Sequence, residues 1–155
     1  MAQQYWLLKS EPDTYSIDDL ARDRRTGWEG VRNFQARNLL RSMKAGELGF
    51  FYHSSATPPG IAGILRVARE AYPDPSQFDP KSGYHDAKSD PKDPRWSTVE
   101  VEFVRKLPEL LALVALREMP ELREMALLRR GQRLSVQPVT AGEWKAICRR
   151  AGVAS

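Results

Sequence analysis

Two neighbouring strand patterns constrain the fold of this chain more than any other feature. Residues 48–54 and 60–71 are rich in apolar residues, and the segment SATPP between them contains two prolines that cannot donate to a strand ladder. Strands separated by so short a loop pair with each other as a hairpin. We therefore expect an antiparallel hairpin with a stiff loop.

Three further segments have strand patterns. Residues 5–9 begin with the apolar run YWLL. Residues 96–106 alternate valine and phenylalanine with glutamate, so we expect one face of this strand to be exposed to solvent. Residues 134–139 form a shorter strand, which we expect Pro138 to end because proline lacks the backbone N–H.

Capping signals place the helices. A capping box pairs an N-cap Ser or Thr with an acidic or amide residue three positions later, and the chain has two such pairs: Ser16 with Asp19, and Thr140 with Glu143. Asn33 is a suitable N-cap for a helix that continues through Met43. The leucine-rich segment 110–125 is expected to be helical and broken at Pro120.

Length and composition predict one globular domain over residues 1–155. The chain is 41% hydrophobic and 28% charged, and it has no apolar run near the roughly 20 residues that cross a bilayer. The N-terminal MAQQ leads directly into a strand pattern instead of a signal segment, so we expect a cytoplasmic protein without membrane partners. The single cysteine, Cys148, excludes an intrachain disulfide and is expected to be a buried thiol.

Charge is unevenly distributed along the chain. The formal net charge is +4, but residues 22–44 and residues 129–150 each carry +5, which leaves the remainder at −6. Two basic segments on an acidic body favour an anionic partner such as nucleic acid. The alternative is that these arginines only solvate helix faces.

Signals for catalysis are weak. The two histidines, His53 and His85, lack metal-ligand spacing, and there is no nucleophile elbow or phosphate-binding glycine loop. We therefore expect no metal and no cofactor. Ser10, His53 and an aspartate could form a hydrolytic triad, so a small hydrolase or nucleotide-binding enzyme is the alternative to a binding module.

Six segments, in the same order along the chain, resemble the EVE domain family. They are YWLLKSEPDTYSIDDL, TGWEGVRNFQARNLL, FFYHSSATPPGIAGI, YPDPSQFD, PRW and LLRRGQRLSVQPV. The resemblance extends from residue 5 to about residue 147. It implies an α+β fold of the PUA-like type, a pseudo-barrel of five to six mostly antiparallel strands flanked by helices.

The resemblance also implies nucleic-acid binding, because PUA-like relatives include the SRA and YTH readers of methylated bases. In YTH domains a Lys-Ser pair at the end of the first strand contacts the base, and a Trp after the first helix forms one wall of an aromatic cage. Lys9-Ser10 and Trp28 occupy the matching places here. The other walls follow the hairpin, where this chain has Phe78, Tyr84 and Trp96 without a matching motif.

We therefore expect a non-enzymatic module that reads a modified base of DNA or RNA in an aromatic-walled pocket. The expected pocket residues are Lys9, Ser10, Trp28, Val31, Arg32, Asn33 and Ser54, and the expected phosphate contacts are Arg37, Arg41, Arg129 and Arg133. Both basic segments and the strand end at residues 9–10 should open onto one cleft that contains Trp28.

Several of these residues have a structural alternative. Trp28 could pack in the core, and Arg32 could pair with Glu29 or Glu11. The long polar segment 72–96 could be a lid, a binding loop or disordered. The sequence leaves open the choice between DNA and RNA, the modification and the oligomeric state.

Overall fold

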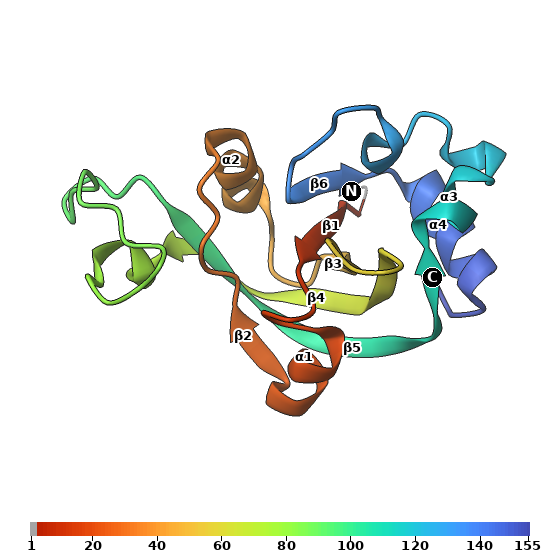
Figure 1. The fold of residues 1–155 in the computed structure, drawn as a ribbon, viewed down its shortest axis with the longest axis horizontal. Helices are drawn as coiled ribbons and strands as arrows, with labels where there is room; N and C mark the ends of the chain where they lie inside the picture. Colours follow the sequence, from red (N-terminus) through yellow and green to blue (C-terminus); the bar gives the residue numbers. More distant parts are fainter. Residues whose placement is uncertain (1–2) are drawn as a thin grey trace.

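The computed structural model describes residues 3–155, and in this part of the chain six strands form one sheet in the order β2-β5-β4-β3-β1-β6 (Figure 1). Strands β1 and β3 are parallel, and the other neighbours are antiparallel. The strands are β1 (Tyr5–Ser10), β2 (Arg25–Gly27), β3 (Leu48–His53), β4 (Gly60–Pro73), β5 (Ser97–Ala112) and β6 (Val136–Val139). The α+β class and the mostly antiparallel sheet are confirmed, and β2 and β6 are its open edges.

Helices cover the sheet, and their predicted caps are present. The helices are α1 (Ile17–Asp23), α2 (Phe34–Ser42), α3 (Leu113–Arg117) and α4 (Ala141–Ala151), with 3-10 turns η1 (Pro75–Phe78), η2 (Pro120–Leu122) and η3 (Ala126–Leu128). Both capping boxes form, and the Asn33 side chain accepts a hydrogen bond from the Ala36 N–H. In Figure 1 the loop after β4, drawn in green, extends beyond the sheet near α2, while α3 and α4 lie at the other end.

The sheet buries apolar side chains on both faces, which explains the nearly continuous apolar strands. Leu7 and Phe50 pack on one face with α4, where Trp144 stacks against Tyr5 and Phe50 at centroid distances of 4.5 and 4.0 Å. The neighbouring Leu8 and Phe51 face the other side, where α1 and α2 pack. Cys148 is fully buried in the first core, and burial raises the pKa of its thiol to about 11.

The predicted helix over 110–125 is largely wrong. Strand β5 continues to Ala112, because Leu111 pairs with Ile61 and is buried by the hairpin, and only the five residues of α3 are α-helical. A leucine-rich run fits either a strand or a helix until its partner is known. Pro120 begins a 3-10 turn, as its fixed φ favours.

Two other differences concern the edges of the sheet. Pro138 lies inside β6 instead of ending it, because β6 is an edge strand and proline's missing N–H needs no partner there. Strand β2 was not predicted: its three residues are polar, and it is held by pairing with β5 and by an ion pair of 2.7 Å between Arg25 and Glu100.

Within residues 3–155 no helix is long and apolar enough to cross a membrane, and no cluster of three or more potential metal ligands is present. Met1 and Ala2, part of the segment from which we expected no signal sequence, lie outside the described residues.

Candidate nucleic-acid interface

A cleft of about 820 Å³ opens where the parallel strands β1 and β3 end. Their register places Ser10 beside His53, and the Ser54 N–H donates to the Ser10 carbonyl at 3.0 Å, so the two strand ends leave the sheet together. The cleft is lined by Lys9, Ser10, Glu11, Thr14, Tyr15, Thr26, Gly27, Trp28, Glu29, Gly30, Val31, Arg32, Ser54, Ser55, Tyr84, Gln132, Arg133 and Ser135.

Seven of the predicted binding residues come together around this cleft. They are Lys9, Ser10, Trp28, Val31, Arg32 and Ser54 from the predicted pocket and Arg133 from the predicted phosphate contacts. Arg32 comes from the first basic segment and Arg133 from the second, so each segment supplies a residue to the cleft.

Trp28 is both a wall of the cleft and part of the core. Its backbone N–H donates to the Val99 carbonyl at 2.8 Å, which ties the segment after β2 to β5. Its ring packs edge-on against Phe51 with 5.4 Å between centroids, and only 8% of the residue is exposed. Trp28 therefore lines the cleft and packs in the core at the same time, although the sequence presented these as alternatives.

Lys9 is a half-buried cation. Burial lowers the pKa of its amine, and Nζ lies 5.9 Å from the centroid of the Tyr52 ring. Lys9 takes part in none of the ion pairs formed within residues 3–155. An amine that has lost water without gaining a carboxylate is suited to a ligand that brings an acceptor or a negative charge.

Ser10 and His53 do not form the hydrogen bond that a hydrolytic triad requires. The Ser10 hydroxyl donates to the Tyr15 carbonyl at 2.6 Å, and His53 Nε2 accepts from the Ile17 N–H at 3.1 Å. Burial lowers the pKa of His53, in keeping with a neutral acceptor. Both side chains organise the turn that leads into α1.

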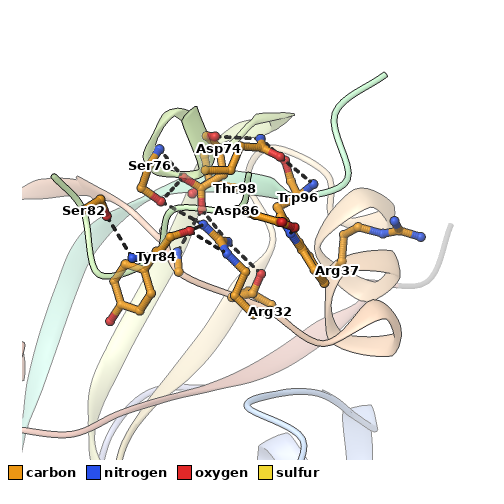
Figure 2. A network of polar contacts seen from close by, with 12 residues as sticks. Arg32, Arg37, Asp74, Ser76, Ser82, Tyr84, Asp86, Trp96 and Thr98 are labelled. Carbon is orange, nitrogen blue, oxygen red and sulfur yellow. Dashed lines mark hydrogen bonds and ion pairs between the residues drawn. The ribbon is translucent and has the colours of Figure 1, made fainter. Parts of the chain in front are cut away.

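Arg32 is bound to Asp74, not to the predicted partners Glu29 or Glu11. Its NH1 lies 3.1 Å from Oδ2 of Asp74, which is fully buried, and its NH2 also reaches the Ser76 hydroxyl at 3.1 Å. Figure 2 shows this network, in which Arg32 joins the segment after β2 to the loop that follows β4. Arg32 and Asp74 are 42 residues apart, and no local pattern predicts such a pair.

The other predicted residues lie outside the cleft. Asn33 is used as the cap of α2, Arg37 donates to the Arg95 carbonyl at 2.9 Å, and Arg41 donates to the Ser97 hydroxyl at 2.9 Å. Arg129 lines a separate hollow of about 390 Å³. The expectation that both basic segments open onto one cleft therefore holds only in part. The arginines of α2 instead contact the long loop between β4 and β5, residues 74–96.

Tyr84 is the aromatic residue of that long loop that reaches the cleft. Trp96 is instead stacked on Phe34 at 4.7 Å, with its Nε1 donating to Asp86 at 2.7 Å. The loop itself is ordered by Asp74 and by Gln77, whose amide bonds the Asp74 and Trp96 carbonyls at 2.7 and 2.8 Å. Sequence analysis also missed Ser55, a cleft residue with a left-handed φ of 51°.

The six-stranded α+β sheet thus has a polar cleft with an aromatic wall at the ends of its parallel strands. The EVE domain family model matches residues 4–150. The chain belongs to the EVE domain family.

Relatives and solved structures agree with this assignment. Human thymocyte nuclear protein 1 is 42% identical over 90% of this chain and 70% of its own length. A crystal structure of human THYN1 protein in complex with 5-methylcytosine-containing DNA superposes with a TM-score of 0.93, at 39% identity, over 99% of this chain and 100% of that chain. The YTH domain of the Zygosaccharomyces rouxii MRB1 protein shares the fold, with a TM-score of 0.54 at 13% identity over 99% of this chain and 90% of that chain.

Proposed function

We propose that this protein is a non-enzymatic reader of nucleic acid, one EVE domain over residues 1–155, that takes a modified base into the cleft at the ends of β1 and β3. The observation that carries the proposal is the convergence of Lys9, Ser10 and Trp28 on one cleft with Arg133, which has no ion-pair partner within residues 3–155. Human THYN1, which has the same fold over the whole chain, has been crystallised with 5-methylcytosine-containing DNA.

The energetics of base capture fit these residues. Unstacking a base costs a few kcal/mol, and stacking on an aromatic side chain returns about 1–3 kcal/mol. Trp28 supplies one such surface, and the Ser10, Ser54 and Lys9 groups supply polar contacts to the base edge or to its phosphate. Lys9 and Arg133, which line the cleft, supply the main sequence-independent part of the affinity.

Discrimination of a modification needs more than stacking. Burying one methyl group contributes about 0.8 kcal/mol, which is about fourfold in affinity. A reader that excludes the unmodified base must leave it with a void or an unpaired polar group. The mainly polar lining provides groups that such a mismatch would leave without partners.

The proposal includes no chemical step. A hydrolase in this cleft would need a nucleophile and base in contact, but Ser10 and His53 each have another partner. The cytoplasmic location predicted from the sequence remains part of the proposal, as does a function without a cofactor.

The test is a titration of the 155-residue protein with DNA and RNA oligonucleotides that each carry one modified base, beside unmodified oligonucleotides of the same sequence. We expect one modified oligonucleotide, with 5-methylcytosine DNA as the first choice, to bind at least about fourfold more tightly than its unmodified counterpart. Mass spectrometry should recover it unchanged. Equal affinity for all pairs, or a converted oligonucleotide, would overturn the proposal.

A further inference from the structure

Tyr84 lines the cleft and is exposed. It is 45% exposed, and it comes from a loop far in sequence from the other lining residues. Its hydrogen bonds within residues 3–155 all involve its main chain, so the hydroxyl does not hold the ring. Arg32 Cζ lies 5.7 Å from the ring centroid, and the exposed part of Tyr84 contributes to the cleft lining.

The Tyr84 ring packs directly on Gly30. A Cβ atom on Gly30 would lie 2.6 to 2.8 Å from three ring atoms of Tyr84, Cζ, Cε1 and Cε2, which is closer than carbon atoms can approach. Gly30 also has a φ of +87°, which a residue with a side chain adopts only with strain. The ring thus rests directly on the backbone of the segment that carries Trp28.

The buried Asp74 carboxylate is linked to both residues of this contact: it binds Gly30 directly and Tyr84 through Arg32. Its Oδ2 accepts a hydrogen bond from the Gly30 N–H at 2.8 Å and binds Arg32 NH1 at 3.1 Å. Arg32 in turn donates through Nε and NH2 to the Tyr84 carbonyl, at 3.1 and 2.6 Å. Figure 2 shows these bonds between Arg32, Asp74 and the Tyr84 carbonyl, which fix the main chain of Tyr84.

We infer that Tyr84 is a second wall of the cleft, on which the bound base or its neighbour stacks, and that the buried Arg32–Asp74 pair positions it. This inference rests on the proposed function. Pre-positioning an aromatic surface lowers the conformational cost of binding, because the loop does not have to be ordered by the ligand. Arg32, which the sequence indicated as a ligand contact, is here a positioning residue.

Removal of the ring tests the first part. The Tyr84→Ala and Tyr84→Phe variants are titrated with DNA that carries one 5-methylcytosine, with His85→Ala, an exposed neighbour outside the cleft, as control. Loss of a stacking surface should weaken binding roughly 5- to 150-fold in Tyr84→Ala. Tyr84→Phe should stay within about twofold of wild type, as should the control. Wild-type affinity in Tyr84→Ala would overturn the inference.

A double-mutant cycle tests the positioning role. Arg32→Lys keeps the charge but lacks the planar group that bonds the Tyr84 carbonyl twice, so it should weaken binding in the wild-type background. In the Tyr84→Ala background it should have no further effect, because its action passes through the ring. Equal losses in both backgrounds, or no loss in either, would overturn the positioning role. Thermal unfolding of each variant verifies that the folded protein is being titrated.

The two proposals fail in different ways. If wild-type protein binds none of the modified oligonucleotides in preference to their unmodified counterparts, the proposed function is wrong, and the inference with it. If wild type discriminates and Trp28→Leu does not, while Tyr84→Ala behaves as wild type, the cleft reads bases with one aromatic wall and only the inference is wrong.

Discussion

At the scale of single residues, Trp28 shows how a binding surface is made from a core residue. One side of its indole packs against Phe51, and the same residue lines the cleft, although only 8% of it is exposed. Support from the core fixes the ring's orientation, so that stacking on it costs little conformational entropy. Stability and binding are therefore linked at this position.

This link gives a first prediction. Trp28→Ala should lower the free energy of unfolding by about 3–5 kcal/mol, because it leaves a cavity beside Phe51. Trp28→Leu fills more of that space and should cost less. Urea denaturation of both variants measures the difference. A Trp28→Ala protein as stable as wild type would mean that the indole is not part of the core.

At the scale of elements, the start of α1 joins the sheet to the cleft. His53 leaves the end of β3 and accepts a hydrogen bond from the Ile17 N–H, while Ser16 and Asp19 cap the same helix turn. The first N–H groups of a helix lack intrahelical partners, so a neutral imidazole there satisfies one of them. Protonation of His53 would remove this acceptor.

A pH-dependent stability follows from the lowered pKa of His53. Burial and the Lys106 charge depress this pKa below 6.5, while Asp18 opposes them. The unfolded chain therefore binds a proton at a higher pH than the folded one, so the contribution of His53 is complete above pH 6.5 and is lost as pH falls towards the folded pKa.

Melting temperatures at about pH 7.5 and about pH 5.5 measure this effect above the range in which most carboxylates titrate. The wild type should be less stable at the lower pH. His53→Gln cannot titrate and should flatten the dependence, whereas His85→Gln should retain it. An equal pH dependence in wild type and His53→Gln would assign the effect to other groups.

Local sequence signals predicted the helix caps and the hairpin, because the interacting residues lie within a few positions of one another. The capping boxes at Ser16 and Thr140 both form. Strand β2 and the end of β5 were missed because their partners are distant in sequence. Strand β2 has no large apolar side chain, and the end of β5 is leucine-rich and also fits a helix. Local periodicity carries no information about such pairings.

At the scale of the whole molecule, the fold divides the basic residues among different surfaces. Arg37 and Arg41 hold the long loop against α2, Arg32 is bound to Asp74, and Arg129 lines another hollow. Lys9 and Arg133 are left as basic groups that line the cleft without an ion-pair partner within residues 3–155. The count of charges along the sequence cannot distinguish these cases.

The salt dependence of the binding affinity distinguishes arginines that contact phosphate from those that do not. If Arg133 contacts a phosphate, Arg133→Ala should reduce the slope of log affinity against log salt by about 0.7–0.9, without changing the preference for a modified base. Arg129→Ala, a matched change in the same segment, should reduce the slope less. Equal slopes for wild type and Arg133→Ala would exclude the phosphate contact.

The site was only partly predictable for the same reason. Lys9 and Ser10 end a strand that the apolar run at residues 5–8 predicts, and the family resemblance pointed to both of them and to Trp28. Tyr84 and the partner of Arg32 depend on how the long loop folds back, which is decided by Asp74 at a position where the sequence shows only a polar turn. The sequence indicated Tyr84 only beside Phe78 and Trp96, and the tertiary structure is needed to choose among the three.

The most direct test of the account is the ratio of dissociation constants for unmodified and modified DNA, measured for wild type and for folded Trp28→Leu. We expect a ratio of at least about four in wild type and a ratio near one in Trp28→Leu, because without the indole the base loses one of its two stacking walls and is no longer held in the cleft. The affinity for unmodified DNA should change little. An unchanged ratio in Trp28→Leu would show that the modification is read elsewhere and would contradict the account.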